Sequence, residues 1–415
     1  MSIMQKLRIW GLKGAVDYIV ARVRAYRKAQ IFKKNANKYP FANPQIGITV
    51  VGALSDQGSL NKTLRDFCFS LKDAGIPFQT YDLGSNQISA EDVSPILTRR
   101  EDFRVARYTN LVEMISSPVP DGIVKKRSRI VFWEFESGLL EGYPVLMERQ
   151  GDIVGMSDFN FNYYKDVFRG KRNVYKILYP LRVSTEGGLS VENARRRYNI
   201  PLNAFVVFYN FSYKSGLDRK NPEGAIKAFA KALSKKQDAM LVLKTVAACE
   251  YPDRALALRE LAKELNILDK MLFVDEYLSQ GDVLNLTNAC DVYLSLHRAE
   301  GFGLGIAEAM SKGKPVVVTD YSSTTEFCNA SNSILVDYDM ITAKSNNKLY
   351  TAAEKWAEPR VDKAADALLR LYADRNLRER LGVAARESIL RHYSIDNFKK
   401  SIVEYLSLDA AIPTL

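Results

Sequence analysis

The stretch SLHRAEGFGLGIAEAM runs from Ser295 to Met310 and joins three local patterns. An apolar run over 291–296 leads into a turn with three glycines, and a helical pattern begins at Ile306. Because glycine has no Cβ, the N–H groups of such a turn can approach a ligand, and the unpaired amides of a helix start favour an anion. The sequence therefore predicts a strand, a glycine loop and a helix start suited to a phosphate.

Two carboxylates bracket this loop. Glu300 precedes the glycines, and Glu308 lies about one turn into the expected helix. Carboxylates accept hydrogen bonds from hydroxyl groups, so the pattern favours a phosphate-bearing ligand with hydroxyls at both ends. The alternative is an ordinary glycine-rich turn with two solvated glutamates. The spacing matches neither the dinucleotide fingerprint nor the P-loop.

Composition bounds the class of protein. The chain has 415 residues, long enough for two domains, and its 47% hydrophobic content suits full globular cores. Its four cysteines form no C-x-x-C pair, which argues against a zinc site or disulfide framework and favours a reducing cytoplasm. The two histidines, His297 and His392, exclude a histidine-based metal centre. We expect no metal and no cofactor, and a structural role for His297.

Positive charge is concentrated at the start of the chain. Residues 1–40 hold ten Lys or Arg against one acid, so they carry +9 of the net charge of +11, which argues for a basic arm and against a nucleic-acid surface. Apolar residues recur there at helical spacing, namely Leu12, Val16, Ile19, Val20, Val23 and Tyr26. The pattern predicts a basic amphipathic helix, too interrupted by charge to span a bilayer. It favours binding of residues 1–35 to an anionic membrane surface; the alternative is packing on the protein's own body.

Strand-like and helical runs alternate over residues 41–182, which predicts a first domain with a mostly parallel sheet. Gly58 follows its first strand, where such a sheet usually binds ligand; an ordinary turn is the alternative. Glu134 and Glu136 follow the run at 130–133, expected to be a strand, where a carboxylate can be aimed into a cleft. We expect one of them, Glu134, to act on the acceptor side. The alternative is that it lies on a solvated rim.

A second alternation covers residues 183–394 and predicts a second domain facing the first across a cleft. After its first strand, Lys214, Arg219 and Lys220 crowd ahead of an Asn-Pro helix start. Cations there could neutralise a diphosphate held by the glycine loop, although a solvated basic turn is the alternative. A last helix over 395–415 is expected to cross back to the N-terminal domain.

Several of these segments resemble one known family. Glu300 to Glu308, written E-G-F-G-L-G-I-A-E, looks like the E-x7-E region of the retaining glycosyltransferases of family 4. Three further segments resemble a bacterial branch of that family, namely KNPEGAIKAF at Lys220–Phe229, Ser322–Glu326 and WAEP at Trp356–Pro359. The resemblance covers most of residues 205–395 and implies a GT-B fold of two Rossmann-like, doubly wound α/β domains.

The resemblance also implies roles for individual residues. Glu308 would bind the ribose hydroxyls of a nucleotide sugar, and Glu300 with the loop would hold the donor sugar and diphosphate. The loop residues concerned are Gly301, Phe302, Gly303 and Leu304. Lys220 stands at the family's phosphate-binding lysine, whereas Lys214 stands where the family usually has an arginine, and a lysine does not offer the same bidentate fork. The family often has a histidine in its N-terminal domain; no histidine precedes His297 here, so Glu134 is proposed instead.

As catalytic candidates we therefore take Glu300, Lys220, Lys214 and Glu134, and as donor-binding candidates Gly58, Arg219, Gly301, Phe302, Gly303, Leu304 and Glu308. The expected activity is retaining, metal-independent hexosyl transfer from a nucleoside diphosphate sugar to a cell-surface polysaccharide or lipid-linked glycan. The expected location is the cytoplasmic face of the cell membrane, as a peripheral protein. The alternatives are a soluble glycan synthase or small-molecule glycosyltransferase, and a non-catalytic module that binds sugar nucleotides or scaffolds an assembly.

Overall fold

The computed structural model describes most of the chain as two compact units. One comprises residues 1–132, 143–182 and 393–415, and the other residues 133–142 and 183–392. The described residues are 19–20, 23–24, 26–28, 30–31, 45–56, 58–85, 87–99, 102–103, 108–114, 126–148, 151–182, 188–345, 350 and 355–407.

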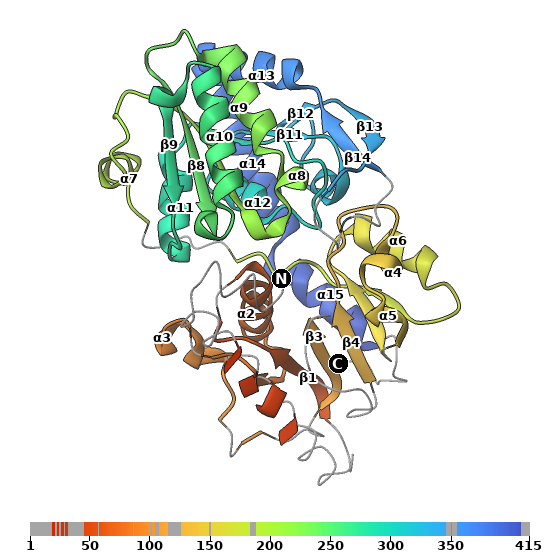
Figure 1. Ribbon diagram of the computed structural model, residues 1–415. Helices are drawn as coiled ribbons and strands as arrows, with labels where there is room; N and C mark the ends of the chain where they lie inside the picture. The colour runs from red at the N-terminus through yellow and green to blue at the C-terminus, as the bar shows by residue number, and fades with distance from the viewer. Residues whose placement is uncertain are drawn as a thin grey trace. The chain divides into compact units, whose positions relative to one another are not determined.

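The first unit is built on a six-stranded parallel sheet (Figure 1). In sheet order the strands are β2 (Phe78–Asp82), β1 (Gln45–Gly52), β3 (Tyr108–Met114), β4 (Lys126–Ile130), β5 (Asp152–Gly155) and β6 (Val174–Lys176). The helices are α2 (Ser59–Asp73), α3 (Ala90–Val93), the 3-10 turn η1 (Ser94–Ile96), α4 (Leu139–Gly142, grouped with the second unit), α5 (Val145–Glu148) and α6 (Asp158–Val167). The apolar run of β1 is fully buried at Ile48, Val50 and Val51, as a strand covered on both faces requires.

The strand expected over the run at 130–133 lies earlier, over Lys126–Ile130. Hydropathy alone does not identify this segment as a buried strand, because it contains Arg127 and Arg129. Both side chains are nevertheless buried in the sheet. Both pair with the buried Glu113 of β3, at 2.5 Å from Arg127 and 3.2 Å from Arg129. A buried carboxylate between two guanidinium groups compensates charges that would otherwise be costly to desolvate.

The chain returns to the first unit through α15 (Ile395–Ser407). Phe398 packs edge-on against Phe67 of α2 with ring centroids 5.7 Å apart. The Tyr405 and Ser128 hydroxyls share a hydrogen bond of 2.8 Å, which ties the helix to β4. Residues 408–415 of the expected terminal helix lie outside the described residues.

The second unit has its own six-stranded parallel sheet. In sheet order its strands are β12 (Ile334–Val336), β11 (Val316–Thr319), β10 (Val292–Ser295), β7 (Phe205–Ser212), β8 (Ala239–Val246) and β9 (Met271–Asp275). The helices are α7 (Val191–Arg197), α8 (Leu217–Lys220), α9 (Pro222–Leu233), α10 (Pro252–Glu264), α11 (Gln280–Ala289), α12 (Leu304–Ser311), α13 (Val361–Ala373) and α14 (Arg375–His392). Short 3-10 turns are η2 (Tyr213–Ser215), η3 (Ala248–Glu250), η4 (Leu268–Lys270) and η5 (Ser322–Glu326).

The direction of winding reverses in the middle of this sheet. The chain runs outward from β7 through β8 to β9, with α9 and α10 side by side on one face (Figure 1), then returns to β10 on the other side of β7. Right-handed crossovers place α11 and α12 on the opposite face. The carboxyl ends of β7 and β10 therefore meet at a topological switch point, where open α/β sheets bind ligands.

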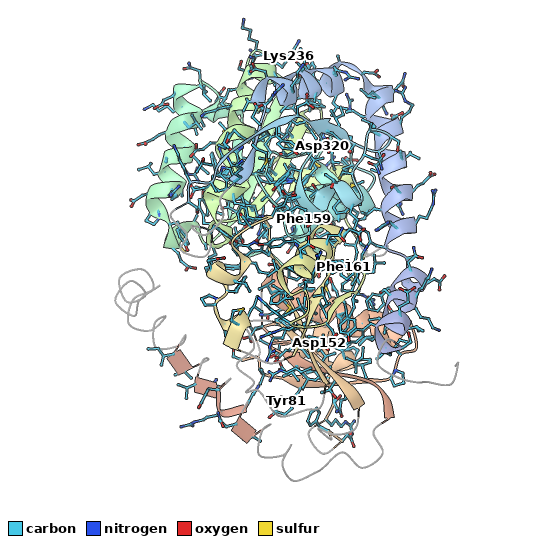
Figure 2. The ribbon with its side chains drawn as sticks, turned by 90° about the vertical axis from the view of Figure 1, so that its right-hand side faces the viewer. Tyr81, Asp152, Phe159, Phe161, Lys236 and Asp320 are labelled. Carbon is cyan, nitrogen blue, oxygen red and sulfur yellow. The ribbon has the colours of Figure 1, made fainter. Side chains whose placement is uncertain are left out.

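A two-stranded antiparallel hairpin follows β12. It pairs β13 (Tyr338–Thr342) with β14 (Lys355–Pro359), and Ile341 faces Trp356 across the pair. Figure 2 shows side chains throughout both units, with Asp320 labelled in the second.

Candidate functional site

The candidate site lies at the switch point of the second sheet. The loop after β7 supplies Arg219 and Lys220 through the short helix α8, and the loop after β10 supplies Glu300. Asn221, in the left-handed region at φ 50°, separates α8 from α9 and caps α9 by accepting a hydrogen bond of 3.0 Å from Gly224 N–H. Its amide also donates to the Leu296 carbonyl at 2.9 Å, which fixes the two loops against each other.

Three charged side chains meet there. The Lys220 ammonium forms an ion pair with Glu300 Oε1, and an Arg219 terminal nitrogen lies 3.2 Å from Glu300 Oε2. Arg219 also donates to the carbonyl of Ala299 at 2.7 Å and of Ser215 at 3.0 Å. A guanidinium held by two carbonyls is pre-oriented, so the cluster presents fixed positive charge at the loop.

Burial and charge together set the ionisation of this cluster. Burial alone would raise the pKa of Glu300, but the charges of Lys220 and Arg219 outweigh it and lower that pKa to about 2. Burial raises the pKa of Glu134, against the lowering effect of Arg219. Glu300 therefore stays ionised at neutral pH, and Glu134 is the carboxyl in this cluster that more readily holds a proton.

The glycine loop has the form that the sequence predicts. Gly303, at φ 90°, begins α12 and offers no side chain to cap it. A Cβ there would come within 2.6 Å of the Thr324 methyl, and one on Gly305 within 2.4 Å of the Tyr293 hydroxyl. Glycine is therefore required at both positions by space, and at Gly303 by backbone conformation as well.

The remaining residues of the loop take different places. Gly301 follows Glu300 directly, and Leu304 is the first residue of α12. Phe302 is buried and packs against Phe327, with ring centroids 5.6 Å apart. Glu308 is buried on α12 and acts electrostatically on Lys312, whose pKa is lowered mainly by burial.

Lys214 lies apart from the ion cluster. Its ammonium pairs with Glu250 at 2.6 Å and donates to the Tyr277 hydroxyl at 3.1 Å. The sequence grouped Lys214 with Arg219 and Lys220, but the structure brings only the latter two to Glu300. The glycine at 216, with φ 78°, turns the chain between them.

Glu134 joins the cluster from an unexpected part of the fold. Residues 133–142 were expected in the N-terminal domain but group with the second unit. Glu134 Oε1 lies 3.4 Å from Arg219, and accepts a hydrogen bond of 3.3 Å from the Tyr350 hydroxyl. The Tyr350 ring also lies under the Arg219 guanidinium, 5.5 Å from its centre. Sequence reasoning missed Tyr350, since a lone tyrosine in a polar stretch carries no signal.

His297 is structural in this arrangement. It is fully buried, 3.2 Å from the Ser295 hydroxyl and 3.3 Å from the Tyr321 carbonyl. Burial lowers its pKa from 6.5 to about 4, so the ring is neutral at physiological pH. It supports the strand end behind Glu300.

Gly58 belongs to the first unit, where it precedes α2 at φ 116°. Much of the basic N-terminal segment lies outside the described residues, including Leu12 and Val16. Its described part is helical, and Lys28 reaches the Gly84 carbonyl at 2.6 Å. The hydroxyl of Tyr81, labelled in Figure 2, donates to the Lys28 carbonyl at 2.8 Å. None of the described helices has the length and apolar content to cross a bilayer.

Similarity to known proteins identifies the domain that carries this cluster. Residues 191–388 match the family described as glycosyl transferases group 1. These residues belong to that glycosyltransferase family. A relative in Corynebacterium urealyticum, a D-inositol 3-phosphate glycosyltransferase, is 28% identical over 233 residues, or 54% of this chain and 47% of that protein. The chain therefore matches about half the length of that curated relative.

Solved glycosyltransferase structures share the fold. A glycosyltransferase from Rickettsia africae has a TM-score of 0.60 and 15% identity, covering 88% of this chain and 99% of that one. Anabaena HepE in complex with UDP and glucose has a TM-score of 0.59 and 15% identity, with 88% and 100% coverage. Sucrose-phosphate synthase from Thermosynechococcus elongatus has a TM-score of 0.60 and 15% identity, covering 89% of this chain and 100% of that one. The family resemblance and the α/β fold with two parallel sheets are thus confirmed.

Proposed function

We propose that this glycosyltransferase moves a hexosyl unit from a nucleoside diphosphate sugar to a glycan acceptor, with retention of configuration and without a metal. The contact of Lys220 and Arg219 with Glu300 at the switch point carries the proposal. It supplies a buried cation, Arg219, a partly buried cation, Lys220, and an ionised carboxylate beside a helix start that has no side-chain cap. This set matches a diphosphate and the hydroxyls of a sugar.

In the proposed mechanism, the cations stabilise the negative charge that develops on the departing nucleoside diphosphate. Lys220 and Arg219 are held in place before reaction, and preorganised charges of this kind are worth on the order of 3 kcal/mol each in a transition state. The amides of Gly301 to Leu304 support the diphosphate. Glu300 accepts from the sugar hydroxyls, and Glu308 from the ribose.

Two other candidates take part in this mechanism. Glu134 is proposed to act on the reacting sugar, because it contacts Arg219 and burial favours its protonated form. Lys214 is proposed to contact the donor from the side of Glu250 and Tyr277. We assign the acceptor to the first unit, where Gly58 lies in the loop between β1 and α2.

Donor binding and turnover test this function directly. UDP-, GDP- and dTDP-sugars are screened for a rise in melting temperature, since a ligand of the native state stabilises it by mass action. The donor found is then assayed for transfer and hydrolysis. Turnover supports the proposal. Binding without any turnover contradicts it and favours the non-catalytic module, for which the separation of Lys214 from the ion cluster is the supporting observation.

The acceptor is proposed to be a polysaccharide or lipid-linked glycan at the inner membrane face. Along the described part of the basic N-terminal helix, Val23 and Tyr26 expose 45% and 58% of their surface. Exposed apolar residues among basic ones suit the interface of an anionic bilayer. Sedimentation with anionic vesicles is compared for the whole chain and a variant lacking residues 1–34. Equal binding of the two would contradict the membrane role and favour a soluble enzyme.

A further inference from the structure

A pocket lies in the same unit, next to the helix α8 that carries Arg219 and Lys220. It has a volume of about 560 Å³ and is lined by the β13–β14 hairpin, α8, the start of α9 and Arg298. Neither Lys220 nor Glu300 lines it. Its size is that of a small-molecule site.

The hairpin turns one face toward this pocket. Strand pairing sets Ile341 opposite Trp356, and Glu358 lies two residues further along on the same face. All three line the pocket, as does Thr342 at the end of β13, whereas Met340 does not. Across from the hairpin, the pocket is lined by Asp218 of α8 and by the first turn of α9.

The walls hold fixed polar groups. Arg298 donates to Glu358 at 2.5 and 3.0 Å, and its guanidinium lies 5.3 Å from the Trp356 ring centre. Asp218 Oδ1 accepts from Arg254 at 3.0 Å. The indole nitrogen of Trp356 is buried and finds no acceptor in the described part of the chain.

The chemistry of the lining selects a class of ligand. Three carboxylates, Asp218, Glu223 and Glu358, stand against two cations, Arg298 and Lys344, so the lining disfavours a phosphate or another anion. Carboxylates and guanidinium groups bind hydroxyls, while apolar side chains contact the C–H face of a sugar ring. Ile341 and Pro222 provide such contacts.

We propose that this pocket binds an uncharged saccharide unit of a glycan chain, at a site separate from the donor. The identity of this glycan as the acceptor or product of the enzyme rests on the proposed function. The binding of the saccharide itself does not rest on it. Helix α8 contributes residues to the pocket lining and also carries Arg219 and Lys220. A bound glycan would therefore contact the helix that supplies the cations.

A pair of neighbouring substitutions tests the site. Ile341→Trp fills the pocket, while Met340→Trp adds the same side chain on the opposite face of the same strand; the two residues are 39% and 42% exposed. Wild type and both variants are applied to an array of neutral and acidic oligosaccharides. Free hexoses are titrated separately, to distinguish a chain unit from a single sugar. Donor-induced thermal stabilisation confirms that each variant is folded.

We expect wild type and Met340→Trp to bind neutral oligosaccharides, and Ile341→Trp to bind at least tenfold more weakly with donor binding unchanged. Equal binding by Ile341→Trp, binding of acidic glycans or free hexoses alone, or no binding at all would overturn the proposal. These results would leave the proposed function standing, because that function fails only if the donor is not turned over.

Discussion

Glu134 Oε1 lies 3.4 Å from Arg219, although the two residues come from stretches that the sequence assigns to different domains. Tyr350 completes the contact by donating to Glu134 and lying against Arg219. The second unit therefore assembles the cluster from three separate parts of the chain, and each part can be tested by substitution.

Lys220→Ala is expected to lower turnover at least a hundredfold while the protein stays folded. The ammonium is the cation nearest Glu300, and losing one preorganised charge costs on the order of 3 kcal/mol in the transition state. Steady-state transfer rates provide the measurement. The control is Lys227→Ala, which removes an exposed lysine from α9. Retained turnover in Lys220→Ala would remove Lys220 from the mechanism.

Tyr350→Ala is expected to reduce kcat/KM for the donor about tenfold, because a cation–π contact of 1 to 2 kcal/mol with Arg219 is lost. Tyr350→Phe keeps the ring and loses only the hydrogen bond to Glu134, so we expect a smaller loss. The two variants are compared in initial-rate assays. An equal loss of kcat/KM in Tyr350→Phe and Tyr350→Ala would show that the ring contact with Arg219 does not cause the effect.

Stability is expected to fall on acidification through the titration of His297. Its folded pKa of about 4 lies below the ordinary 6.5, so between these values the unfolded chain binds a proton that the folded chain does not. The free energy of unfolding therefore decreases by about 3 kcal/mol as the pH is lowered from 6.5 to 4. Denaturant titrations across this range measure it.

His297→Gln removes this titrating group and should flatten the dependence of the unfolding free energy on pH. An unchanged slope in His297→Gln would show that other groups cause the acid loss.

Gly303→Ala is expected to destabilise the protein by about 2 kcal/mol more than Gly313→Ala. Both glycines have positive φ, so both variants carry backbone strain. Only at Gly303 does the new Cβ meet a side chain, the Thr324 methyl at 2.6 Å; at Gly313 the nearest atom is 3.6 Å away. Thermal unfolding of the two variants gives the difference. Equal losses would show that η5 yields to the added methyl.

Local pattern predicted much of the fold and part of the site. The apolar runs of β1, β7 and β10 and the glycines before α12 identify parallel strands and a helix start, because these features depend on neighbouring residues alone. Lys220 and Glu300 were placed by position after strands whose carboxyl ends must meet.

What the sequence did not predict depends on contacts between distant residues. β4 reads as polar because Arg127 and Arg129 are neutralised by Glu113, on a different strand. Lys214 could not be separated from Lys220 without knowing the turn at residue 216. Tyr350 enters the cluster only through the hairpin, and no local pattern points to it.

The position of α15 bears on how this protein is made. Residues 395–407 complete the unit that the N-terminal half begins, through Phe398 and Tyr405. Because α15 is made after residues 183–392, the side of the first unit that holds Phe67 and Ser128 is covered only after the second unit has been synthesised.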